Sequence, residues 1–136
     1  MSETLSAALW VRERVKGWKE APNNHELNEV LRRMARWRSR LLANTYLQHH
    51  GAKIMGGIFA GMEYVSAAAE GALVPRLFGT YEDELHPHIL AILEEGIDCV
   101  IDVGCAEGYY AVGLARLAPE ARVRAYDIDE GARTAC

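Results

Sequence analysis

Long apolar runs are missing from this chain. None approaches the about 18 residues that a membrane-spanning helix needs, and residues 1–20 are charged throughout, unlike a secretory signal peptide. Cysteine is also scarce, with three residues whose odd number and spacing fit neither a disulfide framework nor a metal site. We therefore expect a cytoplasmic protein that does not insert into membranes and holds no metal.

No strong excess of one charge marks the chain as a whole, since its net charge is −4. Bulk electrostatics therefore predict neither nucleic acid nor a membrane as partner. The two parts differ, because residues 1–48 hold nine Lys/Arg against five Asp/Glu, whereas residues 49–136 hold six against fourteen. The basic part can lie against the acidic part within one chain or between two copies, so a homo-oligomer stays open.

Two amphipathic helices are predicted in the first fifty residues, because apolar residues recur at helical spacing through residues 4–20 and again from 27 to 42. Asn23 and Glu26 form a capping box at the start of the second helix, and Gly51 ends it. We expect residues 1–51 to be a helical N-terminal extension. A hairpin and loop connector follows over residues 52–78.

Within the connector, residues 53–65 contain three glycines among apolar residues and suggest a short hairpin or an irregular strand pair. Residues 66–71 are small and loop-like. Pro75–Thr80 lead as a connecting segment to a helix expected at Glu82–Glu95, which Gly96 ends.

The segment from Asp98 to Asp129 has the pattern of a β-α-β unit. Cys99–Val103 is a short apolar run typical of a parallel strand covered on both faces. A glycine turn follows at residues 104–108, then helical spacing over Tyr109–Leu117, then a second strand at Val123–Asp127. Such a unit is suited to hold an adenosine-bearing cofactor over its strand ends, with the turn close to the ligand and the helix N-terminus near an anionic group.

The turn fits some nucleotide-binding motifs poorly. A dinucleotide fingerprint places glycines at 104, 106 and 109, and this chain has Gly104, Ala106 and Tyr109 there, so NAD is disfavoured. No Gly-Lys-Ser/Thr follows the turn, which argues against a P-loop. Asp127 lies 23 residues after Gly104, close to the separation expected of a carboxylate that accepts hydrogen bonds from both hydroxyls of a ribose.

The spacing Asp102-x-Gly104-x-Ala106-x-Gly108 resembles the first motif of the class I S-adenosylmethionine-dependent methyltransferases, in which three alternate glycines follow an acid. The resemblance extends over about residues 79–135, and the segment from Gly79 is similar to the FkbM-type branch, from which Glu107 and Asp127-Ile128 depart. It implies that Asp102 holds the methionine amino end, that the 104–108 backbone lies along the methionine, and that Asp127 takes the ribose. Ile128 then packs against adenine, and Tyr81 closes over the methionine end. The implied cofactor-binding residues are Tyr81, Asp102, Gly104, Cys105, Ala106, Glu107, Gly108, Asp127 and Ile128.

We therefore expect an α/β fold, in which the helical extension precedes the first β-α-β unit of a Rossmann-like domain at residues 79–136. The resemblance implies S-adenosylmethionine as cofactor and methyl transfer to an acceptor that the sequence does not identify. Proteins of this class have a seven-stranded sheet, so we expect the chain to be a truncated fragment that is inactive alone. The alternative is a non-catalytic remnant that acts as an assembly or interaction module.

Five arginines lie within nine residues around Trp37, at positions 32, 33, 36, 38 and 40. One interpretation is a helix that binds RNA or phosphate. The other is a solvated helix face that pairs with acidic residues, and the acidic remainder of the chain favours it over nucleic acid. His49-His50 and His86-x-His88 lack the further ligands of a tetrahedral metal site.

Overall fold

The computed structural model describes residues 2–18, 20–65 and 73–136, so the loop expected at residues 66–71 lies outside the described residues. The chain forms two compact units, residues 1–46 and residues 47–136. The first is helical and the second holds a parallel two-stranded sheet, which confirms a mixed α/β protein with N-terminal helices before a β-α-β connection. Among the described residues, no helix is both long and apolar enough to cross a bilayer.

Two helices begin the chain, α1 (Glu3–Lys16) and α2 (Asn24–His50). The predicted capping box of α2 is confirmed, because the Asn23 N–H donates to Glu26 Oε2 at 3.1 Å and the Glu26 N–H donates to Asn23 Oδ1 at 3.0 Å. Helix α1 ends at Lys16 instead of continuing to residue 20. The backbone N–H of Gly17 bonds back to the last turn and closes it there.

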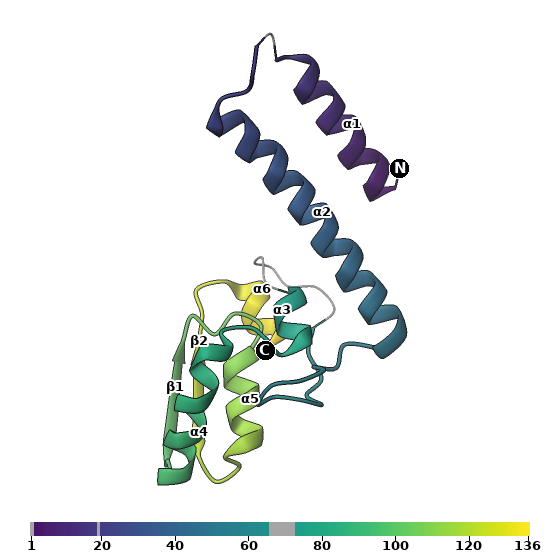
Figure 1. The fold of residues 1–136 in the computed structure, drawn as a ribbon. Coiled ribbons are helices and arrows are strands. Elements are labelled where there is room, and N and C mark those ends of the chain that lie inside the picture. The colour runs from purple at the N-terminus through teal and green to yellow at the C-terminus, as the bar shows by residue number, and fades with distance from the viewer. Residues whose placement is uncertain (1, 19, 66–72) are drawn as a thin grey trace. The chain divides into compact units, whose positions relative to one another are not determined.

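Polar contacts join the antiparallel helices α1 and α2 inside the first unit (Figure 1). At one end, the indole N–H of Trp37 donates to Thr4 Oγ1 at 3.2 Å, and Arg40 pairs with Glu3 at 2.8 Å. Arg14 of α1 pairs with Glu29 of α2 at the other end. The apolar side chains of these helices are only partly covered, and residues such as Leu31 remain more than half exposed.

The second unit opens with the irregular hairpin that the glycine-rich stretch predicts. The Ile54 N–H donates to the Met62 carbonyl at 2.9 Å, and the Tyr64 N–H donates to the Ala52 carbonyl at 2.6 Å. This hairpin supplies most of the buried apolar cluster of the unit: Ile54, Phe59 and Met62, with Tyr109 from the helix of the β-α-β unit. Residues 52–65 therefore do more than connect, because they provide the core on which that helix packs.

Short helical elements follow, α3 (Leu73–Phe78), a 3₁₀ turn η1 (Asp83–Leu85) and α4 (His86–Glu95). The connecting segment expected at residues 75–80 is thus largely helical, and the helix expected from Glu82 starts four residues later. The backbones of the hairpin and of the α3 end touch at two glycines, since a Cβ on Gly57 or Gly79 would overlap the opposite backbone. Only glycine fits at this crossing.

Strands β1 (Cys99–Val103) and β2 (Arg122–Tyr126) pair in parallel, with Cys99 opposite Arg122 and Val103 opposite Tyr126. Helix α5 (Tyr109–Leu117) connects them, and α6 (Glu130–Ala135) follows (Figure 1). Strand β1 and helix α5 have the predicted bounds. Strand β2 starts and ends one residue earlier than predicted, which places Asp127 just after the strand.

The prediction that β1 is covered on both faces is wrong. Helix α5 packs against both strands, and the alternation of side chains turns Ile101 and Val103 away from it. They are 63% and 81% exposed. The apolar run of β1 therefore describes a strand with one open face.

Aromatic rings fasten α5 to the hairpin. Phe59 meets Tyr109 edge to face, with ring centroids 5.2 Å apart, and also lies directly over Gly113 of α5. A Cβ at position 113 would overlap the Phe59 ring, so this glycine makes room for the ring inside a helix, where glycine otherwise costs stability.

Candidate functional site

Between β1 and α5 the backbone takes left-handed conformations at three alternate residues. The φ angles are 84° at Gly104, 46° at Ala106 and 83° at Gly108. Glycine adopts this region freely, but for an L-residue such as alanine it costs roughly 1–2 kcal/mol. The turn thus holds one strained residue at its centre, at the position where the methyltransferase motif has its middle glycine.

The turn is fastened to the end of β2. The N–H groups of Gly104 and Cys105 both donate to the Tyr126 carbonyl, at 2.7 and 3.1 Å. The Ala106 N–H donates to Asp127 Oδ2 at 2.9 Å, and this bond fixes the strained residue. Asp127 therefore acts as a structural clamp between the turn and the second strand.

The same carboxylate has a second role in its own loop, since Asp127 Oδ1 accepts the Asp129 N–H at 2.8 Å. The backbone N–H groups of Asp129 and Ala106 hold the pKa of Asp127 below its usual value. Asp127 is accordingly ionised at neutral pH. Each of its oxygens uses one lone pair in these bonds and retains a second one for another donor.

Asp102 is the most incompletely satisfied acid of the region. Its Oδ2 atom is buried and has no hydrogen-bond partner among the described residues. Burial raises the pKa of Asp102, the Ala111 backbone N–H opposes this shift, and the nearby Asp127 charge adds to it. A buried acceptor without a donor is costly, so this atom is suited to receive a donor from a ligand.

Glu107 belongs to a different, interior cluster. Its Oε2 accepts from Arg76 Nη1 at 3.0 Å and from the Tyr64 hydroxyl at 3.3 Å, and its side chain is only 3% exposed. Arg76 Nη1 also lies 3.1 Å from the Tyr64 oxygen. Burial raises the pKa of Tyr64 to about 12, although the Arg76 charge opposes this shift. The three side chains form one buried polar network.

Tyr81 lies beside this network, with the Arg76 guanidinium carbon 4.6 Å from its ring centre and the Tyr109 ring 5.5 Å away. The next residue, Glu82, has a left-handed φ of 49° and accepts the Tyr110 hydroxyl at 2.7 Å. This strained residue therefore ties the segment before α4 to the first turn of α5.

The remaining candidates lie around the turn. Ile128 is fully exposed, and Cys105 is buried, which raises the pKa of its thiol, with the neighbouring Cys136 adding to the shift. Gly108 begins α5 against the Cys136 side chain, beside a hollow of about 200 Å³ that Glu107 and Tyr64 also line.

The nine candidates thus fall into two groups. Asp102, the turn and Asp127 come together at the strand ends, whereas Glu107 and Tyr81 meet through Arg76. Arg76 and Tyr64 were missed by the sequence reasoning. A single arginine inside the apolar run LVPRLF was the available indication of a buried charge in need of a partner.

Within the described ranges, no three His, Cys, Asp or Glu side chains gather as a metal site. Comparison with protein-family models, with curated proteins and with solved structures finds no match for this chain. The functional argument therefore rests on the geometry of the turn and its carboxylates.

Proposed function

We propose that this chain carries the first part of an S-adenosylmethionine site of a class I methyltransferase, within a Rossmann-like domain. The supporting observation is the turn between β1 and α5, which is left-handed at 104, 106 and 108. These are the positions of the three alternate glycines in the motif that the sequence resembles. Tight left-handed turns at the end of a parallel strand bring backbone close to a ligand.

The two carboxylates at the strand ends fit the two polar parts of this cofactor. The unpartnered Oδ2 of Asp102 is suited to accept from the ammonium group of the methionine part, a charge-assisted hydrogen bond. Asp127 is ionised and retains lone pairs for the ribose hydroxyls. A Cβ at Gly104 would meet no atom within 4 Å, so the space beside the turn is open to a ligand.

When bound, S-adenosylmethionine supplies an activated methyl group on a sulfonium centre. The residues of this chain bind and orient the cofactor: Asp102 at one end, the 104–108 backbone along the methionine, and Asp127 at the ribose. Orientation is the main demand of methyl transfer on the protein. Tyr81, held between Arg76 and Tyr109, is placed by this proposal at the methionine end.

Calorimetric titration of S-adenosylhomocysteine into the chain, and into the full-length product of its gene, tests the proposal. Asp102→Asn and Asp127→Asn should each weaken binding by about tenfold or more, because charge-assisted hydrogen bonds are lost. Asp98→Asn is the matched control, since this exposed aspartate precedes β1 at its opposite end. Absence of binding to both proteins, or equal effects of the three substitutions, refutes the cofactor site.

A second candidate function is an assembly or interaction module without catalysis. The bare face of the sheet favours it, because Ile101, Val103 and Ile128 expose apolar surface beside open strand edges. Sedimentation at rising protein concentration should then show association that Val103→Lys abolishes. Homocysteine-product binding without association supports the enzyme reading instead.

A further inference from the structure

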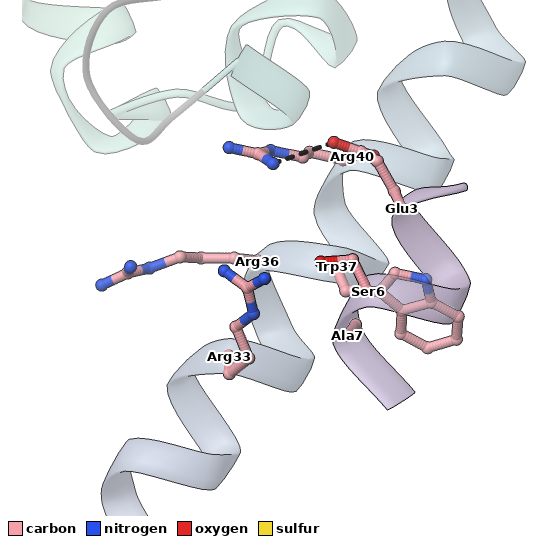
Figure 2. Close-up of a pocket in the computed structure, with 7 residues that line it drawn as sticks. All are labelled: Glu3, Ser6, Ala7, Arg33, Arg36, Trp37 and Arg40. Atoms are coloured by element: carbon pink, nitrogen blue, oxygen red, sulfur yellow. Dashed lines mark hydrogen bonds and ion pairs between the residues drawn. The ribbon is translucent and has the colours of Figure 1, made fainter. Parts of the chain in front are cut away.

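A basic hollow lies between α1 and α2, wholly within the unit of residues 1–46. It has a volume of about 270 Å³ and is lined by three arginines and Trp37 of α2, and by Glu3 and Ser6 of α1. Figure 2 shows the arginine side chains extending from one side of α2, while Trp37 lies across to α1. The hollow is separate from the turn and carboxylates of the candidate cofactor site.

The three arginines of the hollow are Arg33, Arg36 and Arg40, which share one helix face because they are three and four residues apart. Arg40 is paired with Glu3, at 2.8 Å. In the described part of the chain, Arg36 has no ion pair or hydrogen bond. Three cations against one carboxylate leave the hollow with two uncompensated positive charges.

Arg33 adds a desolvated donor. Its guanidinium carbon lies 5.9 Å from the centre of the Trp10 ring, and its Nε atom is buried without a hydrogen-bond partner among the described residues. A buried cationic donor without an acceptor is unfavourable, so an anion that reaches it gains a strong hydrogen bond. The Trp10 ring supports the guanidinium from below and orders it.

The length of the row indicates the kind of anion. Arg33 and Arg40 are seven residues apart, which is about 10 Å along a helix. One phosphate group cannot contact both ends of such a row, whereas successive phosphates of one strand can. Guanidinium groups bind phosphate oxygens in pairs of hydrogen bonds, and the Ser6 hydroxyl in the hollow adds a donor of the kind that contacts sugar and phosphate.

We propose that this hollow binds the phosphodiester backbone of single-stranded nucleic acid. The sequence alone favoured a solvated arginine face paired with acidic residues. In the described structure, Arg40 is the one member of the five-arginine cluster with a carboxylate partner, and that partner comes from α1. The inference does not depend on the cofactor proposal, because no residue of the turn takes part.

Fluorescence anisotropy with a labelled single-stranded RNA of about 12 nucleotides measures the binding. The double variant Arg33→Gln/Arg36→Gln should weaken it by about tenfold and reduce the slope of log affinity against log salt by about 1.4, the equivalent of two phosphate contacts. The matched control is Arg32→Gln/Arg38→Gln, which removes the same charge from the same helix outside the hollow. It should change the affinity by less than about twofold.

A substitution in the opposite direction makes the test independent of damage to the fold. Glu3→Gln frees Arg40 and raises the positive charge of the hollow, so binding should tighten by about threefold or more. Glu13→Gln is the control, since this exposed glutamate lies on α1 outside the hollow. Far-ultraviolet circular dichroism verifies that each variant keeps its helices.

Three results overturn the inference. Equal losses from the two arginine pairs would mean a diffuse basic surface instead of a built site. Competition by millimolar inorganic phosphate at the level expected for a single-ion pocket would mean a smaller ligand. Binding to vesicles of phosphatidylcholine with phosphatidylserine, without binding to RNA, would assign the arginines to a membrane surface.

Discussion

Removal of the Glu107 negative charge tests how the unit of residues 47–136 is held together. Glu107→Gln keeps the size of the side chain but leaves the Arg76 guanidinium buried without a counter-charge. The two side chains are 3% and 10% exposed, so water cannot compensate the charge. Breaking such a pair from one side costs about 3–5 kcal/mol, a third or more of the stability of a typical domain.

The reciprocal replacement should restore most of this loss. Arg76→Met with Glu107→Leu removes both charges and fills the space with apolar groups, an exchange that is often neutral in buried pairs. Only the Tyr64 hydroxyl then loses its partners, at a cost of about 1 kcal/mol. Arg76→Met alone should be as damaging as Glu107→Gln, because it strands the carboxylate instead.

Urea unfolding measures these free energies, and the aromatic residues distinguish the two units. All three tryptophans, at positions 10, 18 and 37, lie in residues 1–46, whereas five of the six tyrosines lie beyond residue 46. Near-ultraviolet dichroism of tyrosine should therefore report the loss, and tryptophan fluorescence much less. Glu63→Gln, at an exposed site of the same unit, is the control. A loss below about 1 kcal/mol for Glu107→Gln, or a double variant no more stable than the single ones, refutes the argument.

Three further predictions concern single positions in the same unit. Gly113→Ala should destabilise by about 1–3 kcal/mol although alanine favours helices, because its Cβ overlaps the Phe59 ring; Phe59→Leu should relieve part of the loss, as urea midpoints will show. Ala106→Gly should stabilise by about 0.5–1 kcal/mol, since glycine removes the left-handed strain at a smaller entropic cost, and a lower urea midpoint would contradict this. Tyr64 has a folded-state pKa of about 12 against 10.0 in its unperturbed state, so its contribution to stability is complete below pH 10.0 and is lost as the pH rises toward about 12. Tyr64→Phe should therefore flatten the decline of stability over that range, and an unchanged decline would show that other groups cause it.

The sequence predicted best what local chemistry determines. The capping box of Asn23 and Glu26 fixed the start of α2, and the apolar patterns gave β1 and α5 their bounds, because each depends on residues within one or two turns. Helix α3 was missed because its six residues contain Pro75 and are too few to establish a helical period. The bare face of β1 was missed because an apolar run does not state what covers it.

The candidate site was predictable at the turn and much less so in the interior. Alternate small residues after Asp102 indicated a tight turn, and the left-handed φ of Ala106 agrees with the motif position it occupies. Glu107 was assigned to the ligand because it stands within that motif. Its partner Arg76 lies 31 residues away in the chain, and no local pattern records a pair of that separation. The division of the candidates into two clusters follows from this tertiary contact.

The crossing of two backbones at Gly57 and Gly79 has a consequence for recognising kin of this chain. Glycine-rich turns between a strand and a helix are shared by many unrelated binding domains, so they distinguish few of them. A backbone crossing without room for a Cβ belongs to this arrangement in particular, as does the glycine at 113 beneath the ring of residue 59. Glycines 22 residues apart, followed by a third after 34 more, with an aromatic residue two positions beyond the first, are therefore the marks by which descent from the same ancestor can be sought.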